Sequence, residues 1–126
     1  MALFVQIIAI VGTLLAMDAV WLSSTAASTR EIFAKLQGQP LEIRWIAAAV
    51  VYALMVVAVW YFAVEPSKTV TEAGTKGAVL GATMYGLYDM TNYATLAKYP
   101  LSFAITDMAW GTFLMAVAAA AGFWVR

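Results

Sequence analysis

Four long runs of hydrophobic residues follow one another along the chain, separated by polar stretches. A bilayer core about 30 Å thick requires ~20 mostly apolar residues in each spanning helix. A window of that length predicts membrane-spanning helices at about residues 2–24, 44–64, 74–97 and 100–124. Because most of the loops are short, neighbouring helices should be antiparallel. The pattern predicts an all-α fold, an integral membrane four-helix bundle in one transmembrane domain, residues 1–126.

The only sizeable polar segment lies between the first two runs and reads SSTAASTREIFAKLQGQPLEIR. Within it, Ser28 and Glu31 have the spacing of a helix capping box, and Gly38 with Pro40 ends the element. This spacing predicts a short interfacial helix at about residues 29–37 that anchors the chain on the membrane surface. The first run lacks a basic flank and a cleavage site, so we interpret it as a retained span.

Composition agrees with a membrane environment and removes several classes of function. The chain is 64% hydrophobic and 11% charged, whereas a soluble domain has about 25% charged residues. Seven basic residues balance seven acidic ones, so no charge excess indicates a nucleic-acid partner. The absence of Cys and His excludes disulfides, thiol chemistry and any site that depends on imidazole. We expect a multi-pass protein of the cell inner (cytoplasmic) membrane, surrounded by lipid.

An even number of spans places both chain ends on one side of the membrane, side A, and the loops after the first and third spans on side B. Side A carries Lys68, Lys76 and Arg126, and side B carries Arg30, Lys35, Arg44 and Lys98. Because these charges are nearly balanced, the positive-inside rule does not select an orientation.

Three acidic residues fall within the hydrophobic runs: Asp18, Asp89 and Asp107. A carboxylate near the middle of the membrane costs roughly 2.5 to 3.5 kcal/mol on insertion scales, so three of them require an explanation. Each lies about seven or eight residues from the side-B end of its span, which at 1.5 Å per residue is roughly 10 Å below that surface. The sequence therefore predicts one acidic layer.

Polar and aromatic residues recur around these acids. Asp-x-x-Trp occurs at 18–21 and at 107–110, and the stretch YGLYDMTNYAT surrounds the third acid. Residues three or four apart share a helix face, so we expect Trp21 to point toward side B, Trp110 to point deeper, and Tyr85, Tyr88 and Asn92 to donate to Asp89. The candidate ligand-binding or ion-binding residues are Asp18, Trp21, Tyr85, Tyr88, Asp89, Asn92, Asp107 and Trp110.

The basic residues in the predicted spans, Arg44 and Lys76, lie at span ends, so the three carboxylates have no cationic partner at their depth. Either they are protonated and hydrogen-bonded, or a cation or basic substrate supplies the charge, or water enters from side B. Carboxylate, amide and hydroxyl oxygens also suit a hard cation such as Na⁺, Mg²⁺ or Ca²⁺. The metal and its ligands stay open.

Small residues mark one face of the third run. Gly77 and Gly81 form a Gly-x-x-x-Gly pair on the row that leads to Tyr85 and Asp89. Such rows let helices approach closely in lipid. This face therefore either packs within the protomer, which we favour, or forms a homo-oligomer interface.

The segments MDAVWL, YGLYDMTNYATL and TDMAWGT resemble a family of small bacterial membrane proteins known only as domain of unknown function twenty-one seventy-seven. The shared patterns are Tyr-Asp-x-Thr-Asn-x-Ala-Thr-Leu and Asp-x-x-Trp-Gly, matched here by residues 88–96 and 107–111. The resemblance covers nearly the whole chain and implies four spans. It implies no activity.

Three functions remain open. We favour a small transport, channel or solute-binding protein with a site for a proton, a cation or a small cationic ligand. The alternative is an accessory or assembly subunit in which the buried Asp layer is structural. A membrane-embedded enzyme acting on a lipid is disfavoured, because the chain has no recognised catalytic motif, no His, and no basic residue beside the three acids to hold a phosphate. We therefore assign no catalytic residue.

Overall fold

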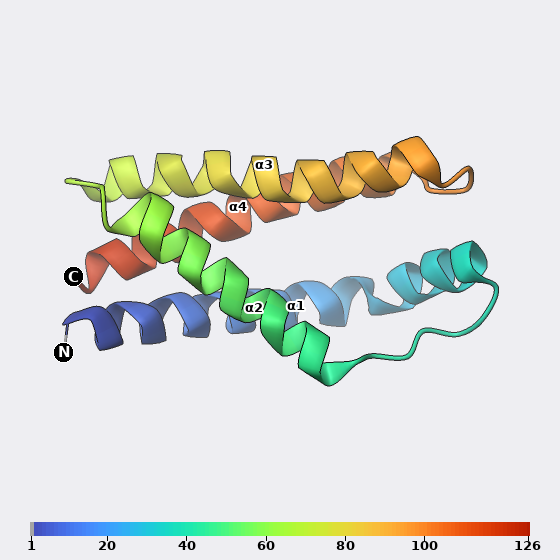
Figure 1. Cartoon of the computed structure of the whole chain (residues 1–126), viewed down its shortest axis with the longest axis horizontal. Helices are drawn as coiled ribbons and strands as arrows, with labels where there is room; N and C mark the ends of the chain where they lie inside the picture. Colours follow the sequence, from blue (N-terminus) through green and yellow to red (C-terminus); the bar gives the residue numbers. More distant parts are fainter. Residues whose placement is uncertain (1) are drawn as a thin grey trace.

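The computed structural model describes residues 2–126, which form four helices and no strand (Figure 1). Their bounds are α1 Ala2–Gln37, α2 Trp45–Ala58, which continues as the π-helix η1 Val59–Val64, α3 Val70–Thr95 and α4 Leu101–Trp124. The all-α prediction is confirmed. Prolines delimit two of these elements, because Pro66 follows η1 and Pro100 occupies the N-cap of α4.

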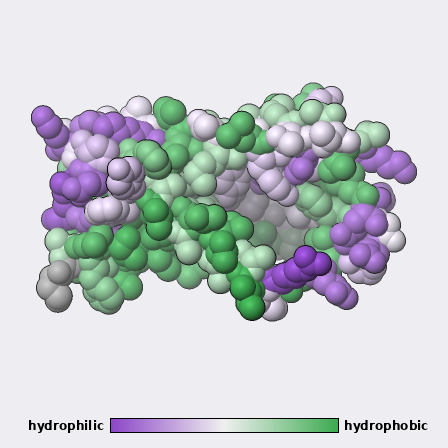
Figure 2. Space-filling model, viewed as in Figure 1, coloured by the Kyte–Doolittle hydropathy of each residue, from purple (hydrophilic) through white to green (hydrophobic). Residues whose placement is uncertain are grey.

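Both termini and the α2–α3 connection lie at one end of the molecule, and the other two connections lie at the opposite end (Figure 1). These ends are side A and side B. Hydrophilic residues gather at the two ends, and hydrophobic residues form most of the surface between them (Figure 2). α1, α2 with η1, and α4 are long and apolar enough to cross a membrane. α3 is long enough at 26 residues, but it is more polar.

The predicted interfacial helix at 29–37 is helical, but it is not a separate element. α1 runs without a break from Ala2 to Gln37, so Ser28 lies inside a helix and caps nothing. The polar stretch before it contains no Gly or Pro, and its hydroxyls satisfy themselves on the helix: Ser23, Ser24 and Thr25 each donate to the carbonyl four residues earlier. Gly38, with a φ of 76°, ends the helix as predicted.

Aromatic contacts hold the extended part of α1 against the rest of the protein. The Phe33 ring meets Tyr99 at 6.0 Å and Phe103 at 5.6 Å between centroids, both edge to face. Tyr99 lies in the α3–α4 loop and Phe103 in the first turns of α4. The side-B end of α1 therefore packs on the α3–α4 hairpin.

α3 and α4 form the most extensive helix pair, and the glycine row makes it possible. Gly77 and Gly81 are buried. A Cβ at Gly81 would collide with the backbone of Gly111, and one at Gly77 with the backbone of Met115. This face is therefore used inside the protomer, and the expected alternative, a homo-oligomer interface through Gly77 and Gly81, is wrong because α4 already covers it.

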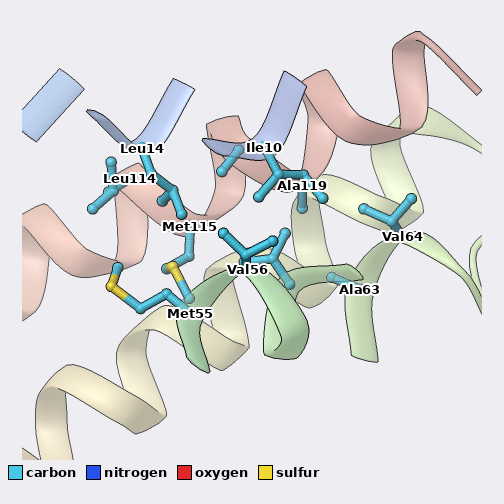
Figure 3. Close-up of a cluster of buried hydrophobic side chains, with 11 residues drawn as sticks. Ile10, Leu14, Met55, Val56, Ala63, Val64, Leu114, Met115 and Ala119 are labelled. Atoms are coloured by element: carbon cyan, nitrogen blue, oxygen red, sulfur yellow. The ribbon is translucent and has the colours of Figure 1, made fainter. Parts of the chain in front are cut away.

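The hydrophobic core lies in the side-A half, and Figure 3 shows its side chains at close range. It joins the first half of α1, the end of α2 with η1, and the second half of α4; its largest fully buried apolar side chains are Ile10, Leu14, Val59, Val64, Leu114 and Met115. Two polar links add to it. The Trp60 indole donates to Gln6 at 2.8 Å, and the Arg126 guanidinium donates to the carbonyls of Val64, Glu65 and Ser67.

The side-B half of α2 leaves the bundle. α2 crosses the molecule obliquely, away from α3 (Figure 1). Trp45 and Ile46 at its start are 74% and 84% exposed. As a consequence, the side-B half has fewer apolar contacts between helices, and it contains the cavity described next.

Candidate functional site

A cavity of about 450 Å³ opens in the side-B half. α1 and α4 supply most of its wall, and α2 and α3 add one Tyr each. The lining residues are Asp18, Trp21, Leu22, Ser24, Thr25, Ser28, Thr29, Ile32, Tyr52, Tyr85, Ser102, Phe103, Thr106, Asp107 and Trp110. Two of the three predicted acids therefore face one space, together with Trp21, Tyr85 and Trp110 from the candidate set.

Asp18 connects three helices. Its Oδ2 accepts a hydrogen bond of 2.5 Å from the Tyr52 hydroxyl of α2, and its Oδ1 accepts one of 3.1 Å from the Trp110 indole of α4. Neither donor carries a charge. The ion pairs that the described residues form, Glu31 with Lys35 and Glu72 with Lys76, lie elsewhere on the molecule. The Asp18 carboxylate is thus hydrogen-bonded without an opposite charge from the described part of the chain.

Trp21 and Trp110 stack on each other at 4.6 Å between ring centroids, with 7° between planes. The sequence placed their side chains at different depths. That expectation is wrong, because helical side chains lean toward the N-terminus of their own helix and α1 and α4 run in opposite directions. Trp21 therefore leans toward side A and Trp110 toward side B, and the rings meet. Together they form one flat aromatic wall.

The acidic layer is also less even than predicted. Asp18 and Asp107 line the cavity, whereas Asp89 is fully buried and does not.

Tyr85 reaches the cavity across α4 because of a glycine. Its ring occupies the place that a side chain at Gly111 would fill. Tyr85 and Asp107 also line a second recess of about 390 Å³ on the α2–α3 side, with Val51, Met55, Met84 and Tyr88. These two residues therefore separate the polar cavity from a more apolar recess.

Asp89 does not line either space. It is fully buried, and its Oδ1 accepts a hydrogen bond of 2.7 Å from the Tyr99 hydroxyl. The expected donors Tyr85, Tyr88 and Asn92 do not fill this role in the structure. Asp89 reaches toward the cavity only through Asp107, whose carboxyl group lies close to that of Asp89.

Within residues 2–126, no three acidic side chains converge tightly enough to hold a metal ion. Asp18 and Asp107 line the same cavity, whereas the third acid, Asp89, is buried outside it. A hard cation held by all three carboxylates, as the sequence allowed, does not fit this arrangement.

Sequence reasoning missed Tyr52 and Tyr99, the two phenols that donate to the buried acids. Tyr52 could have been found, because it is the only hydroxyl in the apolar run of α2. Tyr99 gave no such signal, since a Tyr before Pro100 at a membrane surface is ordinary. Sequence reasoning also missed the hydroxyl residues that line the cavity, such as Ser24 and Thr25.

Comparison with known proteins identifies the family to which the chain belongs. Residues 3–124 match the family model described as "Predicted membrane protein (DUF2177)". The chain belongs to this family of predicted membrane proteins. Neither the curated proteins nor the solved structures contain a significant match to the chain. Family membership agrees with the helical membrane fold and leaves the chemistry of the cavity to be argued from its residues.

Proposed function

We propose that this DUF2177 protein is a small transport or solute-binding protein of the inner membrane whose side-B cavity takes a small organic cation. In this proposal all four helices cross the membrane as one domain, with the Gly77 and Gly81 face of α3 covered by α4. Asp18 and Asp107 supply the negative charge. Trp21, Tyr52, Tyr85 and Trp110 supply aromatic walls.

The observation that carries the proposal is the pairing of two carboxylates and five aromatic residues in one cavity whose lining contains no Lys or Arg. Burying a carboxylate without a counter-charge is unfavourable, and a cationic solute would supply that charge. Trp and Tyr faces attract organic cations, by about 0.5 to 2 kcal/mol each. The site therefore favours a cation with an apolar surface over a bare ion.

The size of the cavity fits the same class of solute. A volume of about 450 Å³ lies within the 300–1,000 Å³ range typical of small-molecule sites. Ser and Thr hydroxyls on α1 and α4 add groups that can hydrogen-bond to a solute or to water at the side-B mouth. A substituted ammonium ion with one ring fits within this space.

The proposal is tested with benzyltrimethylammonium and its uncharged carbon analogue, neopentylbenzene, by isothermal titration calorimetry on the purified chain in detergent. The two probes share shape, so a difference reports the charge. We expect the cation to bind at least about tenfold more tightly, a difference of about 1.4 kcal/mol. Equal affinities, or no binding of the cation, would overturn the proposal.

Two variants locate the binding. Asp18→Asn keeps the shape of the side chain and removes its charge, and we expect it to weaken binding of the cation at least about tenfold. Glu31→Gln is the matched control, because Glu31 is an exposed acid of the same helix, paired with Lys35 outside the cavity. If both variants weaken binding equally, the charge is read at a distance and the cavity is not the site.

One observation favours a second function. Asp18 accepts hydrogen bonds from α2 and α4, and such a contact would also suit a structural acid in an accessory or assembly subunit. Under that alternative, Asp18→Asn lowers the thermal stability of the chain, and no organic cation of this size binds. The calorimetric experiment therefore separates the two functions.

A further inference from the structure

Asp89 is the most deeply buried ionisable group among the described residues, and one of its oxygens lacks a donor. Oδ1 accepts from Tyr99 at 2.7 Å. Oδ2 is inaccessible to solvent and has no hydrogen-bond donor among residues 2–126 when every carboxyl group is treated as ionised. A buried carboxylate oxygen without a donor carries a large desolvation cost. The geometry therefore calls for a proton.

Among residues 2–126, the carboxyl group of Asp107 lies close to that of Asp89. A hydrogen bond between two carboxyl groups exists only if one of them is protonated, because an ionised carboxylate is acceptor-only. Two ionised carboxylates at this distance would repel strongly in a water-poor interior. The other titratable groups that face the pair are Asp18 of α1, Tyr52 of α2, Tyr85 and Tyr88 of α3, and Tyr99 of the loop. None of these supplies a positive charge.

The environment indicates which partner carries the proton. Burial, and then the hydrogen bond to Asp89, raise the pKa of the Tyr99 phenol above its ordinary value, so Tyr99 remains a donor. Asp89 already accepts this hydrogen bond through Oδ1. Asp107 has no such donor among the described hydrogen bonds, and it reaches the cavity. The proton therefore belongs on Asp107, directed at Asp89 Oδ2.

We propose that Asp89 and Asp107 form a proton-binding site, in which the two carboxyl groups hold one proton between the cavity and Tyr99. A second step rests on the proposed function: the site couples the binding of the proton to the binding of the organic cation. A cation that binds beside Asp107 displaces the proton, which leaves through the cavity to water. One positive charge then replaces another, so the buried acids keep the same net charge. Such exchange would make the protein a proton–cation antiporter or a proton-sensitive receptor.

The proton site is tested first, without any organic ligand, by infrared spectroscopy of the chain in lipid. At neutral pH we expect the carbonyl band of a protonated carboxylic acid, which shifts to lower frequency in D₂O. The isotope shift is measured on the unaltered protein, so it does not depend on whether a variant folds. Absence of a protonated-acid band at neutral pH would overturn the proton site.

Variants then assign the band. Asp107→Asn removes the proton carrier and supplies an amide donor to Asp89, and Asp89→Asn removes the acceptor, so each should abolish the band. Glu31→Gln should leave it unchanged, because Glu31 is exposed and paired with Lys35. Helical content is measured by circular dichroism in parallel. A band that persists in both Asn variants belongs to another acid and contradicts the assignment.

Coupling is tested by measuring protons released into weakly buffered solution when benzyltrimethylammonium binds. We expect one proton for each cation bound, and none from Asp107→Asn at saturating cation. Cation binding without proton release would overturn the coupling while the proposed function stands. The infrared band without cation binding would support the proton site and reject the proposed function.

Discussion

The two halves of this bundle use the same helices for opposite purposes. In the side-A half, Gly77 and Gly81 bring α3 against α4, and apolar residues such as Ile10 and Leu114 are fully buried. In the side-B half, α2 leaves the bundle, and carboxylates, phenols and indoles surround a cavity. Close packing at one end therefore supports an open, polar site at the other. The side-A half is therefore the scaffold, and the side-B half carries the chemistry.

The largest expected effect comes from breaking the scaffold. Gly81→Leu places a side chain where the Gly111 backbone lies, so α3 and α4 cannot approach. We expect a loss of stability of about 3 kcal/mol or more, seen as loss of the monodisperse peak in size-exclusion chromatography. Gly12→Leu is the control, because nothing lies within 4 Å of a Cβ at Gly12. Equal tolerance of both variants would contradict the packing described for the side-A half.

Shortening a buried side chain in the same half creates a cavity without a steric clash. The Leu114 side chain is fully buried, with 0% of its surface accessible to solvent. Leu114→Ala should lower the free energy of unfolding by about 2 to 5 kcal/mol, the range for buried Leu. Unfolding in mixed micelles with increasing denaturing detergent measures it. Leu15→Ala is the control, because Leu15 of α1 is 50% exposed. It should lower the free energy of unfolding much less.

The two halves differ in how well their structure can be predicted from the sequence, because only some of their features produce a local sequence pattern. The scaffold was predicted well, because the hydrophobic runs, Pro66, Pro100 and the glycine row are local patterns with direct structural meaning. The oblique path of α2 was not predicted, since it depends on which helices pack together and not on the run itself. The unbroken α1 was missed because Ser and Thr also bond to their own helix.

Only part of the candidate site could be predicted, because only its acidic residues stand out in the sequence. Acids in a hydrophobic run are conspicuous, so Asp18, Asp89 and Asp107 were found. Their partners Tyr52 and Tyr99 come from elsewhere in the chain, and aromatic residues are frequent in membrane helices and at their ends. Which acids share a space, and which lies behind another, requires the register between helices.

Within the side-B half, removing one hydrogen bond should have a modest effect. Tyr52→Phe deletes the donor to Asp18 Oδ2 and leaves the ring in place. We expect a loss of unfolding free energy of about 1 kcal/mol, well below that of Leu114→Ala. The same micelle titration measures both. A larger loss for Tyr52→Phe than for Leu114→Ala would reverse the assignment of scaffold and site.

The smallest expected effect lies at the side-A surface. Glu72 accepts from Lys76 and from the Lys68 backbone, and these contacts lower the pKa of its carboxyl below the ordinary value. A lowered folded-state pKa gives stability that is present above the unfolded pKa and lost as pH falls through the folded one. Acidification below pH ~4 should therefore loosen the first turn of α3 slightly. Hydrogen exchange there should show this, and Glu72→Gln should remove the pH dependence.

The most direct measurement locates the cation itself. Benzyltrimethylarsonium replaces the nitrogen of the ammonium probe with arsenic, which anomalous X-ray scattering detects in a crystal of the complex. We predict one arsenic peak inside the side-B cavity, beside the Trp21–Trp110 stack and between Asp18 and Asp107. No peak in that cavity, or peaks only on the lipid-facing surface or in the side-A half, would contradict the account.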